Sequence, residues 1–191
     1  MKKLRPTFIV GIGGSAGGLN AYKALLDALP PTTGMAFVIV SHIYPTANSQ
    51  LALILSRHTK MPVLLVLMGM PIQANHVYVI PPNADLFIEG HTFKVIVPRM
   101  KRNTQIDVFF TSLAEALGPR SIGIILSGYF IDGTQGCRSI KAKGGTTFAQ
   151  DTSAEVDDMP RHAIAEGCVD FVLPPDKIAD ELVRLAAALK V

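Results

Sequence analysis

The feature that most constrains the fold is the alternation of short apolar runs with amphipathic helical stretches along almost the whole 191-residue chain. Several runs are apolar at consecutive positions, which is typical of parallel strands covered on both faces. The runs predicted as strands are Thr7–Ile12, Ala36–Val40, Val63–Val66, Val77–Ile80, Ile122–Leu126, Thr146–Ala149 and Val169–Val172. The stretches with helical periodicity are Leu19–Leu29, Ser49–Arg57, Ile106–Leu117, Thr134–Lys143, Arg161–Glu166 and Lys177–Leu189. This order predicts an α/β fold with a doubly wound, mostly parallel sheet and helices on both faces.

One segment departs from this alternation. Within Asp85–Val95, two short apolar runs flank the pair Glu89-Gly90, which predicts one small antiparallel β-hairpin. The stretch Pro98–Asn103 is predicted to be an exposed loop. No linker, repeat or low-complexity segment interrupts the sequence, so residues 1–191 are expected to form a single domain.

Composition narrows the class of protein. Apolar residues make up 49% of the chain and charged residues 17%, a balance that argues against disorder. No segment reaches the roughly 20 apolar residues of a membrane-spanning helix, and the N-terminus lacks the apolar run of a signal peptide. A cytoplasmic protein without membrane insertion is therefore expected.

The charged and metal-binding residue types exclude further classes. The net charge is only +3, and the basic clusters contain no interleaved aromatic residues, which argues against nucleic-acid binding. These clusters are Lys2, Lys3 and Arg5, and Arg99, Lys101 and Arg102. Cys137 and Cys168 lack metal or redox spacing, and the histidines lack the spacing of metal ligands, so two reduced core thiols and no metal are expected.

The strongest functional signal is the run Phe8–Gly18, in which an apolar stretch ends in glycines around a single serine. It predicts a strand-to-helix turn with Ser15 beside the free N–H groups of the next helix. Such a position can hold a phosphate or stabilise an oxyanion. The alternative is that Ser15 simply caps the helix.

Two further strand ends carry complementary chemistry. The second predicted strand is followed by Ser41-His42, and the strand Ile122–Leu126 runs into a loop that contains Asp132. Ligands bind beyond the carboxyl ends of strands in open α/β sheets, and a nucleophilic serine needs a base with an orienting partner. Ser15, His42 and Asp132 are therefore a candidate triad, although each residue alone fits a structural role and the sequence does not show that they meet.

A nucleotide site is the rival interpretation of the glycine run. Gly11-Ile12-Gly13 with Ala16 fits the dinucleotide motif, but that motif requires an acid at the end of the second strand. The chain has Ser41-His42 there, which counts against it. The segment Gly13–Gly17 also fits G-x-S-x-G, yet the order Ser, His, Asp differs from that of α/β-hydrolases. Convergent chemistry on a different fold is therefore predicted.

At these residues the chain resembles the catalytic domain of the chemotaxis protein-glutamate methylesterase family, CheB. The matching motifs keep their order over about residues 7–175. They are Gly11–Gly18, Ser41-His42, Val77–Pro82, Leu126–Gly128 with Asp132-Gly133, Ala149–Asp151, and Met159–Arg161 with Ala163-Ile164. The segments Ser15–Gly18 and Val169–Pro175 are most similar to methylesterase domains fused to a methyltransferase.

The resemblance implies hydrolysis of glutamate methyl esters on chemoreceptor helices, with glutamine deamidation in some members and no cofactor. It implies that Ser15 is the nucleophile, His42 the general base and then acid, and Asp132 the orienting carboxylate. Activity should then fall at acid pH as His42 becomes protonated. The implied partners are a methylated chemoreceptor or similar helical signalling protein, and a methyltransferase or receiver domain in trans.

Three other residues enter the predicted site through the same resemblance. Backbone N–H groups at Ala16 and Tyr129 are candidates for the oxyanion hole. Arg161 is a candidate for binding an acidic substrate, with structural pairing to a nearby aspartate as the alternative.

Two positions depart from the family pattern. The family commonly has Gly-Met-Gly before x-Asp-Gly, whereas this chain has Gly128-Tyr129-Phe130, so either the loop backbone differs or the cleft is narrowed. Ala16 replaces a common threonine. A catalytically weakened protein-binding module is therefore the alternative to an esterase. Too few residues precede Thr7 for the family's receiver domain, so regulation by phosphorylation in cis is not expected.

Overall fold

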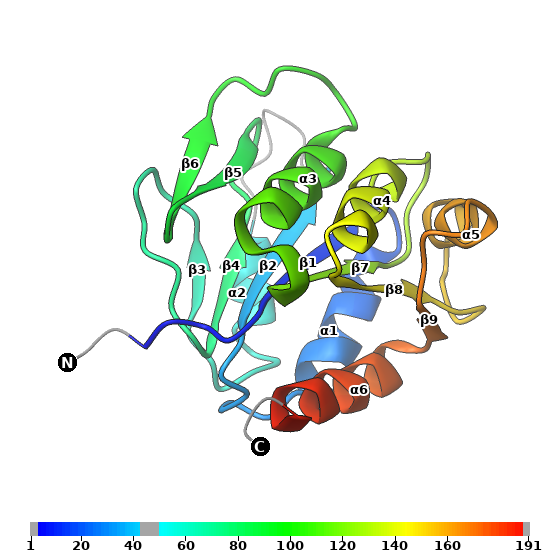
Figure 1. Cartoon of the computed structure of the whole chain (residues 1–191), viewed down its shortest axis with the longest axis horizontal. Helices are drawn as coiled ribbons and strands as arrows, with labels where there is room; N and C mark the ends of the chain where they lie inside the picture. The colour runs from blue at the N-terminus through cyan, green and yellow to red at the C-terminus, as the bar shows by residue number, and fades with distance from the viewer. Residues whose placement is uncertain (1–3, 43–49, 189–191) are drawn as a thin grey trace.

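The computed structural model describes residues 4–42 and 50–188, and its main sheet has the strand order β3-β4-β2-β1-β7-β8-β9 with every neighbouring pair parallel (Figure 1). These strands are β1 (Ile9–Gly14), β2 (Ala36–Ser41), β3 (Val63–Leu65), β4 (His76–Val79), β7 (Ser121–Ile125), β8 (Thr146–Gln150) and β9 (Phe171–Leu173). The helices are α1 (Gly18–Ala28), α2 (Leu51–Leu55), α3 (Gln105–Leu117), α4 (Thr134–Ala142), α5 (Asp158–Ala165) and α6 (Pro175–Ala188). The predicted α/β fold is confirmed. The predicted helix ends at Ser49 and Leu189, and Lys2 and Lys3, lie outside the described residues.

The predicted hairpin is also confirmed. Strands β5 (Asp85–Glu89) and β6 (Thr92–Ile96) pair antiparallel around Gly90, whose φ of 63° is one that glycine adopts at little cost. The buried side chains of the hairpin are Leu86, Ile88 and Phe93, and they belong to the core on one face of the main sheet. The hairpin therefore packs onto that face as a separate two-stranded sheet.

Helices cover both faces of the sheet, as the continuous apolar strands require. On one face α1, α2 and α6 pack through side chains that include Tyr22, Leu25, Leu55, Ile178 and Leu182. On the other face α3, α4 and α5 pack through side chains that include Ile106, Phe110, Ile140, Met159 and Ala163. Figure 1 shows α3 and α4 side by side on this second face. The two cysteines are free thiols buried in the same layer.

Strand β1 has the predicted length but lies two residues further along the chain, because Gly13 and Gly14 are strand residues rather than turn residues. A Cβ atom at Gly11 would lie 2.7 Å from Phe110, and one at Gly13 would lie 2.5 Å from Ile106. Both glycines therefore permit α3 to pack directly against the centre of the sheet. This close packing brings the first turn of α3 to the carboxyl end of β1, where the candidate site lies.

Over residues 4–42 and 50–188, the structure contains no helix with the length and apolar character needed to cross a membrane.

Candidate active site

Sheet topology explains why distant residues meet at one edge. Strand β1 pairs with β2 on one side and with β7 on the other. Ser15 directly follows β1, His42 directly follows β2, and Asp132 lies in the loop after β7. All three strands are parallel, so their carboxyl ends share one edge of the sheet. The chain order reverses at this point of the sheet, which is where doubly wound folds bind ligands.

The turn that carries Ser15 is hydrogen-bonded to the loop after β7. The N–H of Ser15 donates to the carbonyl of Ser127 at 2.9 Å. A Cβ atom at Gly128 would lie 3.1 Å from the Ser15 backbone nitrogen and closer still to Met159, so only glycine fits between them. Gly17 precedes α1 with a φ of 72°, which turns the chain into the helix.

Ser127 joins this turn to two other segments. Its buried hydroxyl donates to the carbonyl of Ala16 at 2.8 Å and accepts the N–H of Val156 at 2.9 Å. Its own N–H donates to the side-chain oxygen of Gln150 at 3.0 Å. These satisfied buried polar groups fix the position of the serine turn relative to the loop that bears Asp132.

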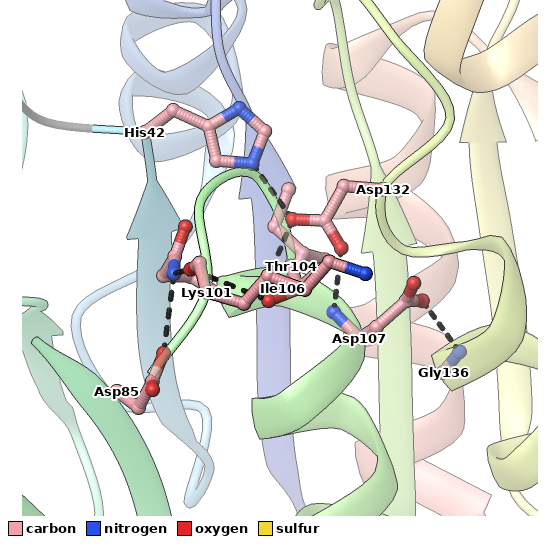
Figure 2. Close-up of polar contacts among 9 residues, drawn as sticks. His42, Asp85, Lys101, Thr104, Ile106, Asp107, Asp132 and Gly136 are labelled. Atoms are coloured by element: carbon pink, nitrogen blue, oxygen red, sulfur yellow. Dashed lines mark hydrogen bonds and ion pairs between the residues drawn. The ribbon is translucent and has the colours of Figure 1, made fainter. Parts of the chain in front are cut away.

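Asp132 is buried and accepts three hydrogen bonds. The backbone N–H groups of Ile106 and Asp107, in the first turn of α3, donate to its two carboxylate oxygens at 3.0 and 2.9 Å. His42 Nε2 lies 2.7 Å from Asp132 Oδ2 (Figure 2). The partial positive charge at the start of a helix stabilises the carboxylate anion. Helix α3 therefore holds the orientation of Asp132.

Asp107, in the first turn of α3, contacts the start of the next helix, α4. Its Oδ1 accepts the N–H of Gly136, in the first turn of α4, at 2.8 Å (Figure 2). Burial raises the pKa of Asp107 to about 6, and the negative charge of Asp132 adds to that rise, while the hydrogen bond from Gly136 opposes it. Two carboxylates thus connect the starts of α3 and α4 beneath the cavity.

The imidazole of His42 has one satisfied and one free nitrogen. Nε2 contacts Asp132, whereas the buried Nδ1 has no hydrogen-bond partner within residues 4–42 and 50–188. An ionised aspartate accepts a hydrogen bond from the N–H of the ring nitrogen that it faces. Neutral His42 therefore carries its proton on Nε2 and a lone pair on Nδ1.

A cavity of about 470 Å³ lies over these groups, a size typical of small-ligand sites. Its described lining residues are Ser15, Ala16, Ser41, His42, Arg99, Arg102, Asn103, Tyr129 and Phe130. The structure thus brings Ser15 and His42 to one cavity and His42 into contact with Asp132. No acceptor within the described residues takes the backbone N–H of Ala16 or Tyr129. These two groups remain available to a ligand.

Arg161 lies elsewhere. It projects from α5, is mostly exposed, and approaches Asp158 with a nitrogen–oxygen distance of 3.6 Å. It is not among the described residues that line the cavity, and the pairing matches the structural alternative predicted for it. His162, its neighbour, contacts the hydroxyl of Thr134 at 2.9 Å.

Phe130 has a left-handed backbone conformation, which glycine adopts more easily than a bulky residue. Its φ is 72°, and its ring lines the cavity. The changed loop backbone and the narrowed cleft both stay predictions. In the described residues, no group of three or more His, Cys, Asp or Glu side chains is arranged to hold a metal ion.

Three supporting residues were not predicted to have a role: Asp107, Ser127 and Gln150. Ser127 and Gln150 lie within motifs that carry the family resemblance, so a signal for them existed. Asp107 looks like an ordinary acidic residue in the first turn of a helix. Its contact with α4 depends on a long-range approach that the sequence does not display.

Comparisons with known proteins agree on one family. The family model described as CheB methylesterase matches residues 10–182. A Leptospira interrogans protein with the provisional name protein-glutamate methylesterase/protein-glutamine glutaminase is 38% identical over 91% of this chain and 92% of its own length. Protein-glutamate methylesterase/protein-glutamine glutaminase 2 of Burkholderia lata is 35% identical over 94% of this chain and 54% of its own length.

A solved structure supports the same relationship. The crystal structure of the Thermotoga maritima CheB methylesterase catalytic domain superposes with a TM-score of 0.85 and 29% sequence identity. The superposition covers 93% of this chain and 98% of that one. The similarity therefore extends over nearly the whole described fold.

Proposed function

This chain belongs to the CheB methylesterase family, and on that premise we propose that it is a serine hydrolase of glutamate methyl esters. Its substrates are side chains of methylated chemoreceptors or similar helical signalling proteins, in the cytoplasm. The observation that carries the proposal is the 2.7 Å contact between His42 Nε2 and Asp132 Oδ2 beside the cavity that Ser15 lines.

The first step is attack by Ser15. Its Oγ bonds to the ester carbonyl carbon while its proton passes to Nδ1 of His42, the nitrogen left free by Asp132. The imidazolium that forms is stabilised by the buried carboxylate. The carbonyl oxygen becomes an oxyanion, for which the unused N–H groups of Ala16 and Tyr129 are the available donors. Donors of this kind contribute a few kcal/mol to transition-state stabilisation in serine hydrolases.

Collapse of the tetrahedral adduct breaks the bond to the methoxy group. His42 returns the proton to that oxygen, so methanol leaves and Ser15 carries the glutamyl acyl group. Water then attacks the acyl carbon as His42 takes a proton from it, and the products are the glutamate carboxyl group and free Ser15. With a glutamine side chain the same steps release ammonia, and this extends the proposal to deamidation.

The nucleotide-binding alternative finds no support in the geometry of the glycine run. Gly11 and Gly13 face Phe110 and Ile106 of the core, rather than a space that could hold a pyrophosphate. The binding-module alternative rests on Phe130, whose side chain lines the cavity. However, Phe130 leaves the His42–Asp132 contact in place, so the esterase proposal is preferred.

The test is methanol release from a methyl-esterified chemoreceptor fragment. Wild-type protein should release methanol, and Ser15→Ala should lose activity by about four orders of magnitude or more, because the nucleophile is gone. Ser56→Ala is the matched control, since the exposed Ser56 hydroxyl only donates to the carbonyl of Leu53. Equal release by wild type and Ser15→Ala would disprove the proposed nucleophile. No release by folded wild type would favour the binding module.

A further inference from the structure

The walls of the cavity differ in chemistry. Arg99, Arg102 and Asn103 come from the loop between β6 and α3, and Tyr129 and Phe130 come from the loop after β7. None of the described lining residues is acidic. The cavity that Ser15 lines thus has a cationic wall from one loop and an aromatic wall from the other.

The cationic wall is fixed by a buried carboxylate. Asp85, completely buried in β5, accepts the backbone N–H of Met100 at 2.7 Å and the side-chain N–H of Gln105 at 3.2 Å. The same Gln105 nitrogen donates to the carbonyl of Lys101 at 2.6 Å (Figure 2). A buried charge satisfied in this way is costly to displace. The loop therefore presents its arginines in a defined place.

The positive charge of Arg102 is available to a ligand. It is exposed and forms no ion pair within residues 4–42 and 50–188. Arginine binds carboxylates through paired N–H groups, which gives geometric selectivity as well as attraction.

The aromatic wall carries apolar surface that the fold itself does not use. Tyr129, Phe130 and Ile131 are 53%, 59% and 60% exposed, and the first two rings meet edge to face with centroids 6.5 Å apart. Phe130 holds its place at a positive φ that disfavours bulky residues. Strain and exposed aromatic surface at a cavity indicate a functional contact.

We propose that this cleft selects an acidic protein segment. Carboxylates that neighbour the reacting glutamate pair with Arg99 and Arg102, and an apolar side chain of the same segment packs against Tyr129 and Phe130. The inference rests on the proposed esterase function because it places the reacting side chain at Ser15. A phosphate-rich strand fits less well, because two arginines are the only cationic residues among the described lining residues and the other wall serves an apolar contact.

Binding without turnover tests this proposal separately from catalysis. The protein is the full chain with Ser15→Ala, and the probes are two fluorescent peptides with one central methyl-esterified glutamate. One has glutamates on both sides of it, and the other has glutamines there. Fluorescence anisotropy should show about tenfold tighter binding of the acidic peptide at low salt, with a smaller difference at high salt.

Charge variants show where that preference arises. Arg99→Gln with Arg102→Gln should reduce the preference for the acidic peptide to about twofold or less. Arg120→Gln is the matched control, because Arg120 is exposed at the amino end of β7, on the opposite edge of the sheet. The proposal is wrong if the double variant keeps the tenfold preference, or if Arg120→Gln loses it to the same extent.

Two substitutions at one position test the aromatic wall. Phe130→Gly and Phe130→Asn both suit a positive φ, but only glycine also loosens the loop. Both should weaken binding of either peptide by about three- to tenfold, since the lost contact is apolar. Unchanged affinity in both variants would remove this wall from the proposal. Circular dichroism establishes that each variant is folded.

Two further results separate the possible failures. A single-stranded oligonucleotide that binds as tightly as the acidic peptide, and loses binding in the arginine variant, would overturn the choice of a protein segment. If wild-type protein binds the acidic peptide selectively but releases no methanol from it, the esterase function fails while the recognition stands. If the wild-type protein releases methanol but binds the two peptides equally well, the recognition proposal fails while the esterase function stands.

Discussion

Two histidine–aspartate pairs among the described residues share a similar geometry in different surroundings. The nitrogen–oxygen distance is 2.7 Å between His42 and Asp132. It is 3.0 Å between His58 and Asp27. Asp132 is buried and is also held by the first turn of α3, whereas the side chain of Asp27 is 57% exposed.

The location of each pair in the fold explains the difference. The first pair lies at the carboxyl edge of the sheet, in reach of the turn that carries Ser15. The second lies beside the C-terminal end of α1, next to a hollow of about 340 Å³ whose lining includes Arg57 and Lys60. The groups around a histidine–aspartate contact therefore decide whether it can take part in a reaction, and the contact alone does not identify a site.

The largest expected difference between the pairs is catalytic. Asp132→Asn should lower kcat for methyl-ester hydrolysis by about three to four orders of magnitude, because an amide that donates to Nε2 forces the proton of His42 onto Nδ1. Asp27→Asn should change kcat by less than about twofold. The measurement is methanol release by the two variants and wild type under the same conditions.

A comparable loss in both variants would show that the comparison is wrong and that Asp27 has a role the structure does not reveal. Retention of near-normal kcat by Asp132→Asn would contradict the assignment of Nδ1 as the basic atom.

The next largest effect concerns the support beneath the buried pair. Asp107→Ala removes the acceptor for Gly136 at the start of α4, which should cost about 1 to 2 kcal/mol in the free energy of unfolding. Asp107→Asn keeps an acceptor oxygen there and relieves the negative charge beside Asp132, so it should unfold less readily than Asp107→Ala. Urea unfolding of both variants and wild type measures these differences.

The pH dependence of stability sharpens this prediction. Burial raises the pKa of Asp107 to about 6 from an ordinary value of 3.8. Between these values the folded protein binds more protons than the unfolded chain, so Asp107 lowers the free energy of unfolding as pH rises through this window. Asp107→Asn should lose that contribution. An identical pH dependence in wild type and Asp107→Asn would show that the carboxyl group is not buried as described.

The sequence predicted the fold and the candidate triad for different reasons. Apolar periodicity is a local property, so strands and helices could be located, with errors of a few residues at their ends. Ser15, His42 and Asp132 were noticed because each follows a predicted strand, and the order of those strands in the sheet brings them to one edge. The strand order itself depends on long-range packing, which periodicity does not encode.

The parts that could not be predicted are contacts between segments that are distant in the sequence. Asp85 lies in the hairpin, yet its carboxylate holds the loop of Arg99 and Arg102. Asp132 contacts α3, the helix that bears Asp107. Asp107 in turn contacts α4, the helix that follows Asp132 in the chain. Gly13 and Gly14 were expected to lie in the turn after the first strand, but both belong to β1, and Gly13 gives space to the Ile106 side chain. Each outcome depends on which helix lies over which strand.

A smaller effect on the free energy of unfolding is expected at Phe130, which lines the cavity. Its backbone is strained, whereas the buried side chains of Ser127 and Asp132 near the cavity have hydrogen-bond partners. A bulky residue in the left-handed region is destabilising by about 1 to 2 kcal/mol. Glycine removes this strain, but part of the gain is lost because glycine gives the unfolded chain more freedom. Phe130→Gly should therefore raise the free energy of unfolding by about 0.5 to 1 kcal/mol. That corresponds to an increase in Tm of about 1 to 4 °C for a chain of this length.

The control for this gain is Tyr129→Gly, at the neighbouring exposed position, which has no positive φ. It should lower Tm, because glycine there adds only disorder to the unfolded chain. A loss of stability in Phe130→Gly as large as that in Tyr129→Gly would show that the Phe130 ring contributes packing that outweighs its backbone strain.

The smallest effect is expected for the exposed pair itself, and it completes the comparison. Asp27→Asn should lower the free energy of unfolding by no more than about 0.5 kcal/mol, because solvent screens the interaction between two partly exposed side chains. Any difference from wild type should shrink further in about 1 M salt, where the screening length is about 3 Å. Chemical unfolding at low and high salt measures it. A loss above about 2 kcal/mol that persists in salt would mean that the pair behaves as a buried one, and the contrast with Asp132 would then rest on the neighbouring serine turn rather than on burial.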